Sequence, residues 1–180
     1  MEDSEVIQLL RYYRHNVLNQ LQLIQGYVSM NKPDIAKEKL GEYNTYLQKE
    51  QKLMDVKAPS FTIWLLFFND THPTIRMTYD VGIKEMNLTD VDTFLTAQCE
   101  KMFDSLYDHL PKTEYYEGHF ELQTARNDTL LIVNIDLSGD FSAIGRKELK
   151  QLQEISQFKI DKTMKGMQCS YLLSLHNEVD

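Results

Sequence analysis

One histidine near the start of the chain stands among residues that could serve phosphoryl chemistry. Arg11 and Arg14 precede His15, and Asn19 follows it by four residues. A neutral imidazole is a competent nucleophile near pH 7, and guanidinium groups attract phosphoryl oxygens and acidic surfaces. An asparagine one helical turn away could hydrogen-bond the imidazole or a phosphoryl group. Most exposed histidines on helices are ordinary surface residues, so these residue types alone leave both interpretations open.

The residues around His15 are expected to form one long helix from about Ser4 to Met30. Apolar residues recur every three or four positions and make a narrow stripe: Val6, Leu10, Tyr13, Val17, Leu21, Ile24 and Val28. A helix advances about 100° per residue, which puts His15 roughly 160° from the middle of that stripe. The expected neighbours of His15 on the polar face are Gln8, Arg11, Asn19 and Gln22, with Leu18 at the edge. The periodicity therefore predicts a histidine displayed to solvent.

The charge pattern makes this helix unusual within the chain. Residues 1–57 carry eight basic and eight acidic side chains, so the net charge of −8 belongs to residues 58–180. Between Glu5 and Asp34 there is no acidic residue. Glutamine and asparagine could simply form the solvated face of the helix, or the surface could be free of carboxylates because something anionic docks there. The negative net charge argues against nucleic acid as a partner.

Composition indicates a globular protein without a membrane span. The chain has 180 residues, of which 42% are hydrophobic and 26% are charged, and no apolar run approaches the roughly 18 residues that a span requires. The acidic start lacks the basic and apolar regions of a signal peptide. Cys99 and Cys169 are isolated, which suggests reduced thiols and a cytoplasmic location. The five histidines show no metal-ligand spacing, so we expect no metal site.

Two domains are expected. A turn at "NKPD" (31–34) joins the first helix to a second one from about Asp34 to Val56, which makes an antiparallel hairpin over residues 1–57. Two helices bury little apolar surface, so pairing of two hairpins into a four-helix bundle predicts a homodimer. Packing on the rest of the chain would serve as well. The segment "KAPSF" (57–61) marks the boundary to a second domain, residues 58–180.

The second domain is predicted to be an α+β sandwich, with helices on one face of a mostly antiparallel sheet. Expected helices span 61–69, 91–110 and 143–156, and expected strands span 74–81, 119–125, 129–137, 158–163 and 169–176. The strands at 119–125 and 129–137 should form a hairpin around Arg126-Asn127-Asp128. The helix at 91–110 should turn one apolar face inward: Phe94, Leu95, Cys99, Met102, Phe103, Leu106 and Leu110. The other histidines, His72, His109, His119 and His176, have no catalytic context.

Glycine spacing argues against a nucleotide site in this domain. Phosphate-binding loops use closely spaced glycines, yet the chain has seven glycines and no Gly-x-Gly. The nearest approach is "DLSGDF" (136–141), where Phe141 should crowd a nucleotide. We therefore expect no productive ATP binding and no bound cofactor.

The stretch "LLRYYRHNVLNQLQLIQGY" (9–27) closely resembles the phosphoacceptor helix of the sporulation initiation phosphotransferase B family. That family's pattern reads Arg-His-Asp, two apolar residues, Asn-Lys-Leu-Gln-Leu-Ile, one residue, then Gly. The matching residues here are Arg14, His15, Asn19, Leu21, Gln22, Leu23, Ile24 and Gly26. The segment "LQKEQKLMDVKAPSFTIWLLFFNDTH" (47–72) is similar to the family's link into its second domain. Asn16 departs from the family's acid, and Gln20 departs from its lysine.

The resemblance implies a phosphotransferase of the sporulation phosphorelay. In that family the histidine, here His15, takes a phosphoryl group from the aspartate of a single-domain response regulator and passes it to the aspartate of a transcription-factor response regulator. It also implies a dimer, a second domain like a histidine-kinase ATP domain that no longer works as one, and Mg²⁺ held by the partner. The expected contacts to partner or phosphoryl group are Arg11, Arg14, Leu18, Asn19 and Gln22. Two other functions remain open: an ATP-using sensor histidine kinase core, and a non-catalytic dimeric module that binds response regulators.

Overall fold

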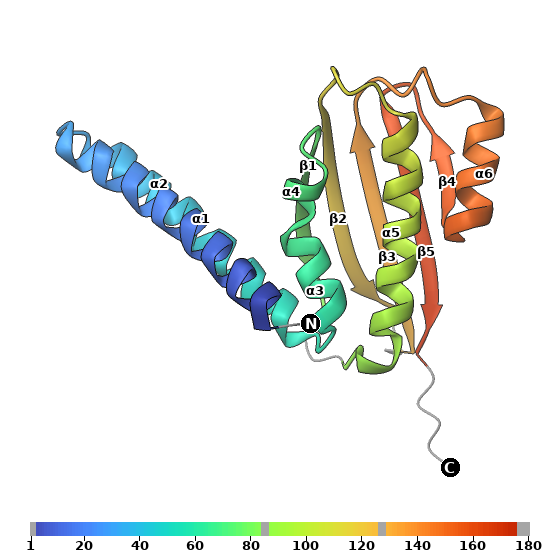
Figure 1. Cartoon of the computed structure of the whole chain (residues 1–180), viewed down its shortest axis with the longest axis horizontal. Coiled ribbons are helices and arrows are strands. Elements are labelled where there is room, and N and C mark those ends of the chain that lie inside the picture. Colours follow the sequence, from blue (N-terminus) through green and yellow to red (C-terminus); the bar gives the residue numbers. More distant parts are fainter. Residues whose placement is uncertain (1–2, 84–86, 126–128, 176–180) are drawn as a thin grey trace, which may run out of the picture. The chain divides into compact units, whose positions relative to one another are not determined.

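The computed structural model describes residues 3–83, 87–125 and 129–175, which form two compact units (Figure 1). The first unit is residues 1–48 and the second is residues 49–180. The division falls within the second helix, α2 (Pro33–Asp55). Leu53, near the end of this helix, and Val56, just after it, belong to the hydrophobic core of the second unit. The domain boundary expected at residue 57 stays a prediction.

The first unit is a helical hairpin. Helix α1 (Asp3–Ser29) and helix α2 (Pro33–Asp55) lie close to the spans expected from the periodicity. Asn31 takes a left-handed conformation with φ of 54°, and the backbone N–H of Lys32 donates to the carbonyl of Tyr27 at 2.9 Å. Asparagine tolerates this conformation at the end of a helix, and proline suits the first position of the next one. The "NKPD" sequence thus reverses the chain as expected.

The second unit is a five-stranded sheet with helices on one face, which confirms the predicted α+β class. Its elements are α3 (Pro59–Leu66), α4 (Phe68–Thr71), β1 (Ile75–Val81), η1 (Thr89–Val91), α5 (Asp92–His109), β2 (Tyr116–Thr124), β3 (Leu130–Ser138), α6 (Arg146–Ser156), β4 (Lys159–Lys162) and β5 (Gly166–Ser174). The strand order is β1-β2-β3-β5-β4. The β2–β3, β3–β5 and β5–β4 pairs are antiparallel, whereas β1 runs parallel to β2.

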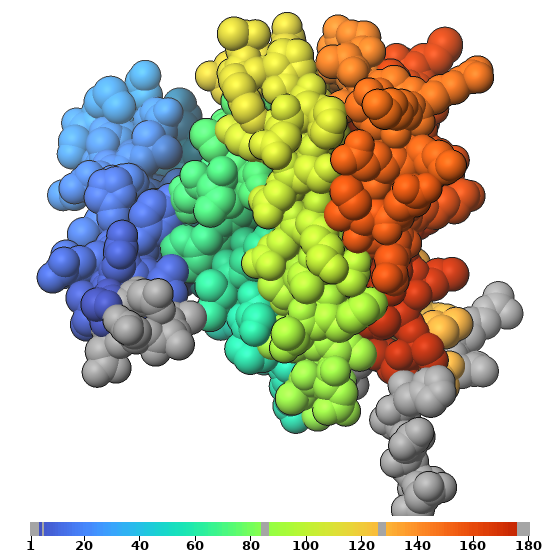
Figure 2. All heavy atoms as spheres, turned by 45° about the vertical axis from the view of Figure 1, so that its right-hand side comes forward, coloured from blue at the N-terminus to red at the C-terminus, as the bar shows by residue number. Residues whose placement is uncertain are grey.

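The core lies between the sheet and its helical layer. Burial alternates along the strands, so that Ile75, Met77, Tyr79 and Val81 of β1 face inward while the residues between them are more exposed. Helices α5 and α6 lie side by side over this face (Figure 2). Aromatic rings from the helical layer form a cluster within this core. Phe68 of α4 and Phe103 of α5 meet edge to face, with their ring centroids 4.6 Å apart.

Four expectations for this unit need correction or fall outside the described residues. The helix expected over 61–69 is two helices, because the chain turns at Phe67, with φ of −100° and ψ of 6°, and Phe68 enters the aromatic cluster. Phe94 was expected inward but is 40% exposed, since its neighbour Leu95 takes the core position. The loop at 126–128 and His176 lie outside the described residues.

Two side chains form hydrogen bonds with backbone groups that have no partner within the helices and the sheet. The buried carboxylate of Asp92 accepts hydrogen bonds from the backbone N–H groups of Ser60 (3.0 Å) and Phe61 (2.8 Å), at the start of α3. At the β1 edge of the sheet, the carboxamide of Asn69 accepts from the N–H of Met77 (2.6 Å) and donates to its carbonyl (3.0 Å). Each contact satisfies backbone groups that would otherwise need water.

Among the described residues, none of the helices combines the length and the apolar character that a membrane span needs.

Candidate functional site

The six residues predicted to form the site are all exposed on α1: His15, Arg11, Arg14, Leu18, Asn19 and Gln22. The helix fixes their spacing, because residues three and four apart share a face. Arg11, Leu18 and Asn19 stand at these spacings from His15, and Gln22 follows seven residues on, which is two helical turns. Arg14 is the immediate neighbour of His15 and therefore lies about 100° around the helix from it. The imidazole of His15 is thus accessible in the middle of a long helix.

Within this group the structure brings Asn19 and His15 together. The Nδ2 atom of Asn19 lies 3.3 Å from Nδ1 of His15, one helical turn away. This contact involves Nδ1, one of the two ring nitrogens of His15. The other ring nitrogen, Nε2, takes no part in it and is therefore available to react with a partner.

The electrostatic surroundings of His15 are one-sided. Arg11 and Arg14 are exposed, and none of the ion pairs within the described residues involves either of them. In the sequence, no acidic residue stands between Glu5 and Asp34. Guanidinium groups beside an exposed nucleophile attract phosphoryl groups and acidic protein surfaces.

The apolar stripe of α1 is largely uncovered in a single chain. Exposed stripe residues are Val6, Leu10, Tyr13, Leu21 and Val28, and Val17 and Ile24 are half-buried. Leu10 and Val28 keep 58% and 59% of their surface accessible. A contiguous apolar surface of this kind on a helix is characteristic of a protein–protein contact.

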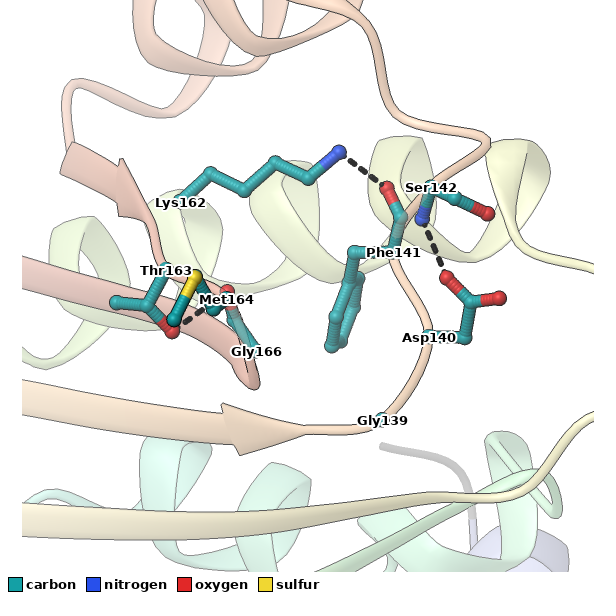
Figure 3. A pocket seen from close by; sticks show the side chains of 8 residues that line it. All are labelled: Gly139, Asp140, Phe141, Ser142, Lys162, Thr163, Met164 and Gly166. Carbon is teal, nitrogen blue, oxygen red and sulfur yellow. Dashed lines mark hydrogen bonds between the residues drawn. The ribbon is translucent and has the colours of Figure 1, made fainter.

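A second candidate site is a hollow of about 490 Å³ at the end of β3 (Figure 3). Its lining residues are Gly139, Asp140, Phe141, Ser142, Lys162, Thr163, Met164 and Gly166. The ammonium group of Lys162 donates to the carbonyls of Phe141 (2.7 Å) and Ile144 (2.8 Å) and so holds the loop after β3. The carboxylate of Asp140 accepts from the N–H of Ser142 at 2.8 Å, and this hydrogen bond lowers the pKa of Asp140.

This hollow is lined by residues 139–141 of the segment that comes nearest to a nucleotide motif, and packing within the fold accounts for Gly139 and Phe141. Gly139 has φ of 142°, and a Cβ atom there would lie 2.5 Å from the ring of Tyr116. Phe141 is buried, with its ring centroid 4.9 Å from that of Tyr116. The glycine is therefore required by the turn and by Tyr116, without reference to a ligand.

Across residues 3–83, 87–125 and 129–175, no group of three or more His, Cys, Asp or Glu side chains could hold a metal ion.

Sequence reasoning missed the role of Lys162. The residue lies in a segment correctly predicted to be a strand, and a lysine on a short strand carries no signal that it will hold a loop 18 to 21 residues earlier. That contact depends on the tertiary fold.

Comparisons with known proteins agree with both units. Residues 1–56 match the family described as the SpoOB-type sensor kinase, alpha-helical domain, and residues 57–170 match the family described as sporulation initiation phosphotransferase B, C-terminal. The sporulation initiation phosphotransferase B of Bacillus subtilis (strain 168) is 33% identical over 141 residues, which cover 77% of this chain and 72% of that protein.

Solved structures with a similar arrangement are more distant. A histidine kinase domain from Erythrobacter litoralis is 10% identical, covers 87% of this chain and 94% of its own, and aligns with a TM-score of 0.46. A histidine kinase from Burkholderia phymatum is 10% identical, covers 93% of this chain and 98% of its own, and has the same TM-score of 0.46. These scores are low, so the family assignment rests on the sequence matches.

Proposed function

This chain belongs to the sporulation initiation phosphotransferase B family, and from that premise we propose that it is a phosphorelay phosphotransferase that uses His15 as its phosphoacceptor. His15 takes a phosphoryl group from the aspartate of a single-domain response regulator and passes it to the aspartate of a transcription-factor response regulator, in the initiation of sporulation. The observation that carries this proposal is an accessible histidine, in the middle of a helix, on a face without carboxylates.

The chemistry requires little of this chain beyond position and charge. Aspartyl phosphate is already activated, so transfer to imidazole depends mainly on in-line approach and on neutralising the phosphoryl oxygens. Arg11 and Arg14 supply positive charge, and Gln22 supplies a further hydrogen-bond donor near the docking face. Leu18, 46% exposed, offers apolar contact to a docked regulator. A Mg²⁺ ion would be held by the regulator's own carboxylates, so this chain binds no cofactor.

We propose that the functional unit is a homodimer. The exposed apolar stripe of α1 is a surface that a second hairpin would cover, giving a four-helix bundle with His15 on its outer side. Because the two α1 stripes would be the same patch on both subunits, the contact is self-complementary, as in most homodimers.

A cytoplasmic location is part of this proposal. Both cysteines are unpaired and buried, and burial raises the pKa of the Cys169 thiol to about 12, well above that of a reactive thiol. Thiols in this state suit a reducing compartment.

Phosphotransfer is tested by mixing the purified full chain with a single-domain response regulator from the same organism, phosphorylated on its aspartate by acetyl phosphate and freed of the reagent. Acid-labile phosphate should appear on this chain without ATP. His15→Gln should abolish the labelling and leave the circular dichroism spectrum unchanged, because the His15 side chain is exposed. Phosphate on the His15→Gln chain would refute the assignment of the acceptor.

The same experiment separates the other two functions. Labelling from ATP alone would indicate a histidine kinase. Binding of the regulator with no phosphate on His15 would indicate a non-catalytic binding module.

A further inference from the structure

An apolar hollow of about 270 Å³ lies where the chain passes from the end of α2 into α3. The residues that line it are Met54, Lys57, Ala58, Pro59, Thr62 and Ile63. Met54 keeps 52% of its surface accessible, although the residue before it, Leu53, is fully buried in the core. A flexible, exposed methionine at the rim of an apolar hollow is characteristic of a surface that binds another protein.

Hydrogen bonds fix the shape of this hollow. The backbone N–H of Leu88 donates to the carbonyl of Val56 at 2.9 Å, and the hydroxyl of Thr89 donates to the carbonyl of Lys57 at 3.1 Å. Lys57 itself takes a left-handed conformation with φ of 55°, which is uncommon for a residue with a Cβ atom. A partner that binds here therefore meets a surface that is already ordered, and binding does not have to order it.

The hollow continues an apolar seam along α2. Leu40, Leu47 and Met54 are spaced by seven residues, so they share one face of the helix. Leu40 and Met54 are exposed, and Leu47 is half-buried. A second hairpin that completes the four-helix bundle would cover this seam, and the hollow stands at the end of it.

The start of α1 in a second copy of the chain matches this position. In an up-down four-helix bundle neighbouring helices are antiparallel, so the partner copy's α1 would begin beside the end of α2. Met54 is 23 residues after Asn31 in the turn, and Leu10 is 21 residues before it. Lys57 is 26 residues after Asn31, and Val6 is 25 residues before it. With the same rise per residue in both helices, Leu10 reaches the height of Met54 and Val6 reaches the hollow.

Charge favours the start of α1 over the hairpin turn as the segment that binds here. Lys57 lines the hollow, and none of the ion pairs among the described residues involves it. The five residues before Val6, "MEDSE", include three acidic residues and no basic one. The turn "NKPD", which would reach the hollow in a bundle of the opposite orientation, has one basic and one acidic residue. Opposite charges select the first arrangement.

We propose that the hollow at the start of α3 receives the first turns of α1 from a second copy of this chain, with the partner's Val6 in the hollow and the partner's Leu10 against Met54. This inference rests on the proposed homodimer and goes beyond it, because it extends the contact between copies from the hairpin to the second unit. Each second unit thereby holds the start of the helix that carries His15 in the other copy.

Disulfide trapping between two differently substituted chains tests this contact. A Met54→Cys chain and a Leu10→Cys chain are unfolded in urea, refolded together and oxidised with glutathione disulfide, so that a bond between the two sites must join two chains. The native cysteines are buried and should not react. One control replaces Leu10→Cys by Met30→Cys, which reports the opposite orientation of the bundle. The other replaces it by Tyr115→Cys, an exposed residue of the second unit.

Mass spectrometry of the linked peptides should find the Met54–Leu10 disulfide in at least tenfold higher yield than either control disulfide. In sedimentation equilibrium, Met54→Gln should raise the dimer dissociation constant about three- to tenfold, because a methionine that is half covered in the single chain loses its apolar contact. Lys52→Gln, an exposed residue about 160° around the same helix, should leave the dissociation constant within about twofold.

The mass of the wild-type chain separates failure of this inference from failure of the homodimer. A dimer in which Met54 links to Met30 more than to Leu10 would overturn the inference and leave the homodimer standing. A dimer whose dissociation constant is unchanged in Met54→Gln would do the same. A chain that stays monomeric would overturn both.

Discussion

Removal of the Asp92 carboxylate should destabilise the second unit more than any exposed substitution near it. Asp92 is 6% exposed and accepts two backbone hydrogen bonds, from Ser60 at 3.0 Å and Phe61 at 2.8 Å. Hydrogen bonds to a charged group are worth about 1.5–3 kcal/mol each. The negative charge also lies at the start of α3, where the helix dipole adds up to about 1 kcal/mol. Asp92→Ala should therefore cost at least about 3 kcal/mol of unfolding free energy.

The assay is urea unfolding followed by tryptophan fluorescence. The chain has a single tryptophan, Trp64, which lies in α3 with its ring centroid 5.7 Å from that of Phe61, so the signal comes from the helix that Asp92 caps. With a slope of about 2 kcal/mol/M for a unit of this size, a loss of about 3 kcal/mol lowers the midpoint by about 1.5 M at constant slope. Asp92→Asn, which keeps an acceptor oxygen without the charge, should lose roughly half as much.

Asp90→Ala is the matched control, because Asp90 is an exposed aspartate two residues earlier. Its unfolding free energy should stay within about 0.5 kcal/mol of the wild type. If Asp92→Ala shifts the midpoint no more than Asp90→Ala does, the two hydrogen bonds contribute nothing measurable and the account of how α3 begins is wrong.

Four further outcomes are expected. Leu21→Glu, which puts a charge on the exposed apolar stripe, should raise the dimer dissociation constant at least tenfold in sedimentation equilibrium; a wild-type chain that is monomeric at micromolar concentration and still transfers phosphate would rule out the bundle. Association with the donor regulator should slow with added salt and with Arg11→Ala or Arg14→Ala, and rates insensitive to both would leave the arginines as ordinary surface residues. Calorimetry with ATP and Mg²⁺ should give no saturable binding below millimolar concentration, and labelling of His15 from ATP alone would contradict this. Burial lowers the pKa of His72, so the unfolded state binds the proton more readily and stability should fall as pH drops below about 6.5; His72→Phe should flatten that dependence between pH 7.5 and 5.5 in urea unfolding.

Periodicity predicted the two long helices of the first unit well because it reports which residues share a face of an element. The stripe from Val6 to Val28 predicts His15 on the polar side of α1, and His15 is exposed in the structure. The contact between Asn19 and His15 was also within reach of sequence reasoning, since residues four apart meet on a helix. The sequence pattern does not identify the surface that covers this stripe.

Tertiary contacts explain what sequence reasoning missed. The turn at Phe67 follows from the space that the aromatic cluster leaves for Phe68, and no local residue marks it. The parallel pairing of β1 with β2 brings together strands separated by the whole of α5. Likewise Asp92 meets the start of α3 across more than 30 residues of chain. Such contacts are decided by packing of the whole unit, which local patterns do not contain.

The carboxamide of Asn69 affects how the β1 edge of the sheet can interact with other protein molecules. An open strand edge can recruit an extended segment from another chain, which is how many folded proteins begin to aggregate. Asn69 occupies both backbone hydrogen-bonding groups of Met77 with one side chain, and so stands where the peptide group of an invading strand would have to bind. In the proposed phosphorelay the chain meets two regulators in turn, and a third protein that paired with this edge would compete with them. The Asn69 contact blocks such pairing at Met77, so the proposal leaves regulator docking to the face of α1.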